Sequence, residues 1–194
     1  MAKTTREHIL ETGLDAISVQ GVSRLSLGPL AERAGMSKSG LFAHFRSKEA
    51  VQLALLERAD ALAHERIVEP AMALPPGLPR LEALVMRWLG WTSRTSLPGG
   101  CPVAAALFEL DDVEGEIRDA VAKLEAEWRD LLSRTVREAV DLGDLSADLD
   151  VAQFVWELGA IYLGHHVSFR FSKDPMADAR AGLALQALFQ RSAP

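Results

Sequence analysis

The chain has 194 residues, of which 48% are hydrophobic and 25% charged, and its formal net charge is −6. This composition supplies enough apolar side chains for a buried core and excludes disorder on a large scale. Cys101 is the only cysteine, which excludes an internal disulfide, and no apolar run approaches the roughly eighteen residues that a membrane helix needs. Because charged residues also interrupt the first twenty positions, no signal peptide is expected, and the sequence predicts a cytoplasmic protein without membrane contact.

The charge is unevenly distributed along the chain. Residues 1–50 carry seven Lys/Arg and five Asp/Glu, a net charge of +2, whereas residues 51–194 carry fourteen and twenty-two, a net charge of −8. An excess of two positive charges is a weak signal alone. The negative total nevertheless does not exclude nucleic acid as a partner of the N-terminal part.

The N-terminal part of the chain predicts four helices. Strand signals are absent, since no alternation with period two is sustained and β-branched residues are sparse. Gly21 ends the first helix, Ser26 caps the second, and Gly35 ends it. Ser37 caps the third helix and Ser47 the fourth. The four helices are expected over residues 4–20, 26–35, 37–45 and 48–68.

The remainder of the chain predicts further helices separated by breaks rich in Pro and Gly. The clearest break is LPPGLP at residues 74–79, and shorter turns lie at residues 97–100 and 173–175. An acidic stretch leads into the longest of these helices. They are expected over residues 80–93, 102–110, about 116–142, 151–171 and 176–190.

Residues 26–48 carry the most informative motif, SLGPLAERAGMSKSGLFAHFRSK. Gly35 can take a positive φ without steric cost, so two short helices can be joined by a tight turn. Leu41 and Phe45, four residues apart, give the second short helix an inward face. Its outward face is then short and polar, comprising Lys38, Ser39, Gly40, Ala43 and His44. A helix that enters the major groove of DNA needs such a face, with donors near its N-terminus and little bulk.

The motif resembles that of the tetracycline-repressor (TetR) family, whose usual pattern is AxxAGVS followed after three residues by LYxHFxSKEAL. The corresponding stretches here are LAERAGMS and LFAHFRSKEAV. The resemblance is specific over roughly residues 5–52 and beyond that only architectural. It implies an all-α fold, with a three-helix helix-turn-helix DNA-binding domain at residues 1–50 and a helical-bundle ligand-binding and dimerisation domain at residues 51–194.

The resemblance also implies which residues contact DNA. They are Ser26, Ser37, Lys38, Ser39, Gly40, Phe42, His44 and Lys48. Lys48, together with the first backbone amides of its helix, is expected to hold a phosphate. The family commonly has Tyr where this chain has Phe42, so the phosphate contact of that hydroxyl is lost. Taken singly, the cations can also be solvated surface charges, and the two serines can act only as helix caps.

Ten of the twelve aromatic residues, including all four Trp, lie after residue 50. The resemblance implies an apolar pocket in this region for a small apolar or aromatic effector, although each ring can equally be plain core. The candidates flank the Pro/Gly breaks, where a bundle can open. They are Trp88, Trp91, Cys101, Phe108 and Trp128.

Cys101 and two adjacent histidines carry the other chemistry that the sequence offers. Cys101 precedes a predicted helix N-terminus, where a thiol can become reactive, and the alternative is a buried, inert cysteine. His165 and His166 are neighbours and lack the i, i+4 spacing of a helical metal site. We therefore expect no metal and no cofactor.

The predicted helix at 151–171 is apolar nearly all round, so it should be covered on two sides. A chain of this size offers one core, and the second side is expected to meet another copy in a four-helix interface about a two-fold axis. The residues assigned to this homodimer interface are Phe154, Val155, Leu158, Tyr162, His165, Leu183 and Leu188. A dimer matches two DNA half-sites about 34–36 Å apart.

These features predict a ligand-responsive DNA-binding transcription regulator, a repressor that binds a palindromic operator as a dimer and is released by a small-molecule effector. One alternative is a helical ligand-binding or carrier protein with weakened DNA binding, because Phe42 lacks the hydroxyl. The other is an enzyme that depends on Cys101, although no catalytic signature accompanies this cysteine and no catalytic residue is assigned.

Overall fold

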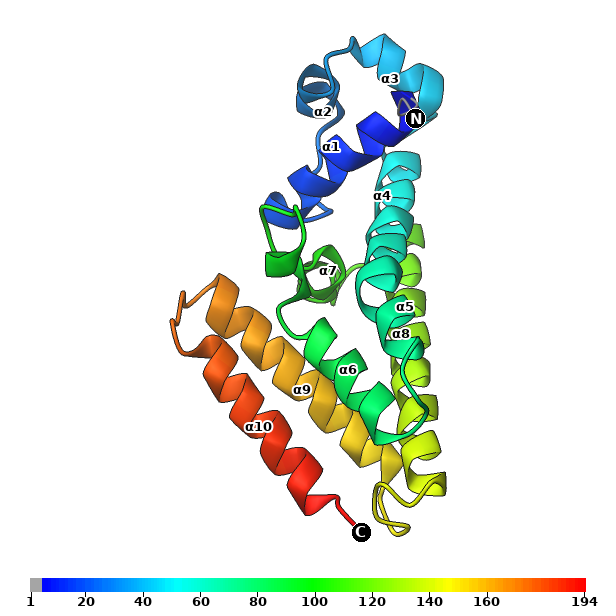
Figure 1. The fold of residues 1–194 in the computed structure, drawn as a ribbon. Coiled ribbons are helices and arrows are strands. Elements are labelled where there is room, and N and C mark those ends of the chain that lie inside the picture. The colour runs from blue at the N-terminus through cyan, green and yellow to red at the C-terminus, as the bar shows by residue number, and fades with distance from the viewer. Residues whose placement is uncertain (1–4) are drawn as a thin grey trace. The chain divides into compact units, whose positions relative to one another are not determined.

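The computed structural model describes residues 5–194, and within this range every regular element is helical, which confirms the predicted all-α class (Figure 1). The chain forms two compact units. The first takes the chain up to Leu62 together with Thr95–Glu125, and the second comprises Ala63–Arg94 and Ala126–Pro194. In the described part of the chain, no helix combines the length and the apolarity needed to cross a bilayer.

The first unit is built around the N-terminal helices. They are α1 (Thr5–Gln20), α2 (Leu27–Arg33), α3 (Lys38–His44) and α4 (Lys48–Ala63). The predicted inward face of α1 is buried, with Ile9 and Ile17 completely so. A Cβ on Gly13 would lie 2.7 Å from a methyl carbon of Leu55, so this glycine lets α1 and α4 pack closely.

The same unit includes a segment that lies far along the sequence. Helix α7 (Pro102–Glu109) and the first part of α8 (Glu116–Asp141) pack against the connection between α1 and α2. Their shared core consists of Val22, Leu56, Ala106, Leu110 and Val121. The compact unit is therefore larger than the fifty residues that carry the DNA-binding motif.

The second unit contains the remaining helices. They are the π-helical turn η1 (His64–Val68), α5 (Glu69–Met72), α6 (Leu78–Trp88), the 3₁₀ turn η2 (Trp91–Arg94), the rest of α8, α9 (Val151–Arg170) and α10 (Ala177–Arg191). Helices α9 and α10 lie side by side and run in opposite directions (Figure 1). The predicted break at residues 74–79 separates α5 from α6.

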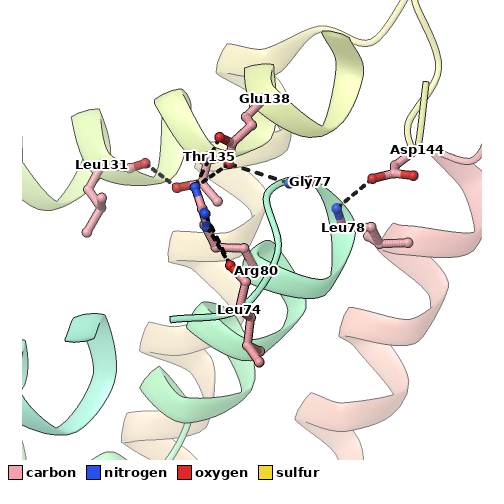
Figure 2. Close-up of polar contacts among 8 residues, drawn as sticks. All are labelled: Leu74, Gly77, Leu78, Arg80, Leu131, Thr135, Glu138 and Asp144. Atoms are coloured by element: carbon pink, nitrogen blue, oxygen red, sulfur yellow. Dashed lines mark hydrogen bonds and ion pairs between the residues drawn. The ribbon is translucent and has the colours of Figure 1, made fainter. Parts of the chain in front are cut away.

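A set of polar contacts fixes the start of α6 to the C-terminal part of α8 (Figure 2). The Arg80 guanidinium donates to both carboxylate oxygens of Glu138 at 3.0 Å and to the carbonyl of Leu74 at 3.1 Å. The backbone N–H of Leu78 donates to Asp144 Oδ2 at 2.8 Å. Helix α6 is thus held at its N-terminal end, while its other end carries Trp88.

Candidate DNA interface and effector site

The turn between α2 and α3 has the geometry that its sequence predicts. Gly35 takes a φ of +67°, and the N–H of Met36 donates back to the carbonyl of Ala31 at 3.0 Å. This bond satisfies one of the carbonyls that the end of α2 leaves without a helical partner. The chain can therefore start α3 at Lys38, only four residues after α2 ends.

Helix α3 presents two different faces. Leu41 is fully buried and Phe45, directly after the helix, is 5% exposed, whereas Lys38, Ser39, Phe42 and His44 are exposed. The predicted inward and outward faces are thus confirmed. Since the exposed face carries only one large side chain, Phe42, the helix has the low profile that a major groove admits.

The start of α3 is fixed by its cap. Ser37 Oγ accepts the N–H of Gly40 at 3.1 Å and lies 3.0 Å from Ser39 Oγ. Ser26 occupies the equivalent position before α2, but its side chain makes no capping bond to the described backbone amides. The prediction that Ser26 caps its helix through its side chain is therefore wrong, and its exposed hydroxyl remains available to a phosphate.

Lys48 at the start of α4 contacts its own chain. Its Nζ donates to the carbonyl of Ser23 at 3.0 Å, which directs the ammonium group towards the α1–α2 connection. Ser47 Oγ accepts the N–H of Ala50 at 3.0 Å. Hydrogen bonds from its own backbone N–H and from Ser47 lower the pKa of the neighbouring Glu49 carboxyl. Capping groups of the protein thus already occupy part of this helix N-terminus, and the Lys48 ammonium is bonded to a backbone carbonyl of its own chain.

Phe42, which lacks the hydroxyl of the Tyr that is common in the resembling motif, lies on the exposed face of α3. Its ring is 41% exposed, and Lys38 Nζ lies 5.9 Å from the ring centroid. An exposed cation over an aromatic ring gains about 0.5–1 kcal/mol. The contact with Phe42 therefore favours a position of the Lys38 ammonium near the exposed face of α3.

Two of the five effector candidates meet inside the second unit. The rings of Trp88 on α6 and Trp128 on α8 have centroids 5.1 Å apart, and Trp88 stacks on Tyr162 of α9 at 4.0 Å. We call Trp88, Trp128 and Tyr162 the aromatic cluster. The sequence predicted Tyr162 at the dimer interface instead, because periodicity does not give the register of α9 against α6.

The aromatic cluster contains a buried donor without an acceptor. Trp128 Nε1 is the one buried side-chain nitrogen or oxygen atom without a hydrogen-bond partner among the residues that the structure describes. Leaving such a donor unpaired costs about 1–3 kcal/mol. An unpaired buried group in a native fold calls for an explanation, such as strain, a buried water, an ion or a ligand.

The interior near the cluster disfavours positive charge on a histidine. The ring centroid of His166 lies 6.4 Å from that of Tyr162. Burial lowers the pKa of His166, and the nearby Arg170 and His165 lower it further. At neutral pH, therefore, His166 is uncharged and its ring nitrogens can each serve as a donor or an acceptor.

The other three effector candidates do not belong to the aromatic cluster. Trp91 is buried in η2, whereas Cys101 and Phe108 belong to the first unit. Phe108 is 57% exposed, so it lines no interior of its unit. Cys101 is buried and its Sγ accepts the N–H of Ala104 at 3.5 Å, which makes it the N-cap of α7.

The structure reverses the assignment of the two faces of α9. Six of the seven residues assigned to the dimer interface are buried within a single chain, where α9 packs on its neighbours: Phe154, Val155, Leu158, Tyr162, His165 and Leu188. For example, the Phe154 and Phe189 rings lie 5.6 Å apart, and His165 Nε2 lies 2.7 Å from Asp178 Oδ1. Leu183 alone is exposed, at 66%. Periodicity showed two apolar faces but not which one its own chain covers.

We give the name α9–α10 stripe to a set of exposed uncharged residues that recur at helical spacing on α9 and α10. On α10 it is centred on Leu183. Its exposed residues, all uncharged, are Ala152, Trp156, Ala160, Gly164, Val167, Ala179, Leu183 and Ala187. Trp156 is 67% exposed, which is unusual for the largest apolar side chain and typical of a protein interface.

Two contacts of α7 escaped prediction, because no local signal marks them. Glu109 accepts the backbone N–H of Ser23 at 2.9 Å, although 86 residues separate them. A Cβ on Gly99 would lie 1.9 Å from the carbonyl oxygen of Ser18, so only glycine fits there. In the sequence, the pair of glycines at 99–100 predicts only a turn and gives no sign of the backbone contact with Ser18.

The tight α2–α3 turn with the capped, outward-facing α3 defines a helix-turn-helix DNA-binding protein. Residues 9–55 match the model of the bacterial regulatory proteins of the tetR family, and residues 77–185 match that of the tetracyclin repressor-like C-terminal domain. The chain belongs to the tetracycline-repressor family.

Individual relatives agree with this family over most of the chain. The transcriptional repressor NemR of Escherichia coli strain K12 is 27% identical over 180 residues, which cover 91% of this chain and 90% of NemR. A TetR-family regulator from Cytophaga hutchinsonii has a solved structure with a TM-score of 0.84 and 19% identity, covering 97% of this chain and 94% of that one. AibR, solved in complex with isovaleryl coenzyme A and operator DNA, gives a TM-score of 0.71 at 21% identity over 93% of this chain and 97% of its own. The chain is accordingly a DNA-binding transcription regulator that acts as a dimer and responds to a small-molecule effector.

Proposed function

We propose that α3 reads the operator and that the start of α4 grips its backbone, with DNA binding assigned to residues 1–50 and effector binding and dimerisation to residues 51–194. The observation that carries the DNA-binding assignment is the exposed face of α3, which begins at the Ser37 cap and carries Lys38, Phe42 and His44 along its length. Gly40 and Ser39 keep this start small. Ser37, Ser39, Lys38 and His44 supply the donors that base edges and phosphates accept.

Lys48 and Ser26 are proposed as phosphate contacts on either side of α3. Lys48 has three N–H donors, and the Ser23 carbonyl takes one of them. The Ser26 hydroxyl makes no capping bond to the described amides, so it can turn to a phosphate. These contacts carry no sequence information but fix the register of α3 in the groove.

The α9–α10 stripe is proposed as the dimer interface. Two copies of an antiparallel helix pair make a four-helix interface in which small residues such as Ala160 and Gly164 allow close approach. A Cβ on Gly164 would meet nothing within 4 Å in the single chain, so this space is open to a partner. The stripe carries no charge that burial would penalise.

The aromatic cluster is proposed as the effector site. An effector that suits it has a flat apolar body to lie against Trp88 and Tyr162 and an oxygen or nitrogen acceptor for Trp128 Nε1. AibR, a protein of the same fold, holds an acyl-coenzyme A together with operator DNA. Because contacts with Glu138 and Asp144 hold the start of α6, an effector at its Trp88 end would move that end the most.

We infer no catalytic step for this chain. Cys101, the one residue suggested for such chemistry, is buried and its sulfur caps α7, which gives it a structural role. Operator DNA places the working protein in the cytoplasm. The carrier alternative gains no support from Phe42, since this ring stays on the DNA-facing side with Lys38.

The decisive experiment compares Lys48→Ala with the wild-type chain on an operator duplex selected from genomic fragments, including DNA that flanks the protein's own gene. Binding is measured by fluorescence anisotropy at several salt concentrations. The variant should lose affinity for every duplex alike, and the slope of log K against log salt should become shallower by about two per dimer. Lys123→Ala, on α8, removes the same charge elsewhere and serves as control. An unchanged slope in Lys48→Ala would refute the phosphate contact.

A further inference from the structure

One end of α7 is attached to the end of α1, and its other end is attached to the α1–α2 connection. Before α7, the N–H of Gly100 donates to the carbonyl of Ser18 at 2.9 Å. This carbonyl belongs to the last turn of α1, where helical partners are missing. After α7 has run its length, the Glu109 carboxylate accepts the N–H of Ser23 at 2.9 Å. Both contacts are polar and span more than eighty residues of sequence.

The same few backbone groups are also held from the opposite side. Helix α4 contributes two side chains one turn apart: Gln52 Nε2 donates to the carbonyl of Val22 at 2.7 Å, and Lys48 Nζ donates to the carbonyl of Ser23 at 3.0 Å. The α1–α2 connection, residues 21–26, is therefore clamped between Glu109 and α4. The Val22–Ser23 peptide accepts from Gln52 and donates to Glu109, so the two bonds polarise and strengthen each other.

Gly21 shows how closely the Glu109 carboxylate is seated. A Cβ on Gly21 would lie 1.8 Å from Glu109 Oε1. Gly21 also has a φ of +84°, which L-residues rarely adopt. The backbone conformation therefore favours glycine at this position, and a side chain there would have to displace the Glu109 carboxylate from its bond with Ser23.

We propose that Glu109 is a positioning residue for operator binding, which through Ser23 orients Lys48 towards a DNA phosphate and so links the position of α7 to the DNA affinity of the head. This inference rests on the proposed phosphate contact of Lys48. When α7 is in place, Glu109 fixes the α1–α2 connection, and the Ser23 carbonyl aims the Lys48 ammonium. When α7 shifts, the connection is released and the Ser23 carbonyl no longer orients the Lys48 ammonium. Helix α7 follows Trp88 and Trp91 along the chain, so movement at the aromatic cluster reaches it through a short covalent path.

The sign of a charge effect makes the inference testable. Glu109 is negative, so its removal by itself should strengthen binding to negatively charged DNA. A positioning role predicts the opposite. In the full-length dimer, Glu109→Ala should weaken binding to the selected operator duplex by about tenfold, the loss expected for a hydrogen bond to a charged group. Glu114→Ala, an exposed glutamate in the same unit, removes the same charge and should bind as well as the wild type or slightly more tightly.

The salt dependence shows whether Glu109 acts through Lys48. Glu109→Ala should flatten the salt slope as Lys48→Ala does, and the double variant should bind no more weakly than Lys48→Ala alone. Glu109→Gln keeps an acceptor oxygen but no charge, and should lose only about threefold because a neutral hydrogen bond is about half as strong. Thermal melting and dimer mass are measured for each variant. If Glu109→Ala does not fold, the Gln variant carries the test.

The outcomes separate the two proposals. Failure of the wild type to bind any duplex overturns the proposed function and this inference with it. A loss of binding in Lys48→Ala, combined with equal or tighter binding in Glu109→Ala or Glu109→Gln, overturns the inference alone. So does a double variant whose losses simply add, because Glu109 and Lys48 would then act independently.

Discussion

The α1–α2 connection and the aromatic cluster differ in how their polar groups are paired. In the first, the backbone groups of Val22 and Ser23 are bonded to Gln52, Glu109 and Lys48. In the second, Trp128 Nε1 is buried without a partner among the described residues. In the first region the polar backbone groups are paired within the chain, whereas the second leaves one buried donor that the proposed effector would pair. The exposed α9–α10 stripe is likewise proposed to be covered by a second copy.

The largest effect is expected from Leu183→Glu, which tests whether the second unit is completed from outside. A carboxylate at the centre of the α9–α10 stripe would be buried unpaired in the dimer, and should convert it to monomers. Loss of the linked second head should lower operator affinity by about a hundredfold or more. Light scattering gives the mass and anisotropy gives the affinity. Leu142→Glu is the control, because Leu142 belongs to the same unit, is 56% exposed and lies outside the stripe. A dimeric Leu183→Glu variant would show that the stripe is not the interface.

Gly99→Ala tests how tightly the head is assembled. The new Cβ would lie 1.9 Å from the Ser18 carbonyl oxygen, and backbone atoms cannot give way cheaply. Overpacking of this kind costs about 1–3 kcal/mol, so the melting temperature should fall by several degrees. Gly28→Ala is the matched control, because its Cβ would meet nothing within 4 Å and alanine favours the helix. Equal melting temperatures for Gly99→Ala and the wild type would mean that the α7 contact with α1 is loose.

The same contrast explains how far the sequence could be read. The turn at Gly35, the caps at Ser37 and Ser47, and the buried Leu41 and Phe45 follow from local chemistry, and they were predicted. Glu109 could not be, since its partner lies 86 residues away and a single glutamate carries no local signal. The two faces of α9 were recognised as apolar, but periodicity does not decide which face its own chain covers. Tyr162 was therefore assigned to the dimer interface and lies instead in the aromatic cluster.

Trp128→Phe tests the unpaired donor in the second unit. Phenylalanine removes the N–H together with part of the ring, so the relief of about 1–3 kcal/mol of unpaired-donor cost offsets the lost packing. The melting temperature of the effector-free protein should stay unchanged or rise. Trp88→Phe, which trims a stacked ring in the same cluster, should lower it. If both variants are destabilised equally, Trp128 Nε1 has a partner in solution and the cluster is ordinary core.

The smallest effect is expected at His166, where the second unit also disfavours charge. Burial, Arg170 and His165 lower the pKa of His166 in the folded chain. The unfolded state therefore binds a proton more readily, and the contribution to stability is complete above the unfolded pKa of about 6.5 and is lost as the pH falls below it. His166→Gln cannot take up this proton. Its melting temperature should fall less than that of the wild type between pH 7.5 and pH 5.5, about one unit either side of that value. The exposed His64 of the same unit, changed to Gln, is the control. Because burial is the main reason for the lowered pKa of His166, identical pH profiles for wild type and His166→Gln would argue that water reaches this position. The proposed effector would then have to displace that water.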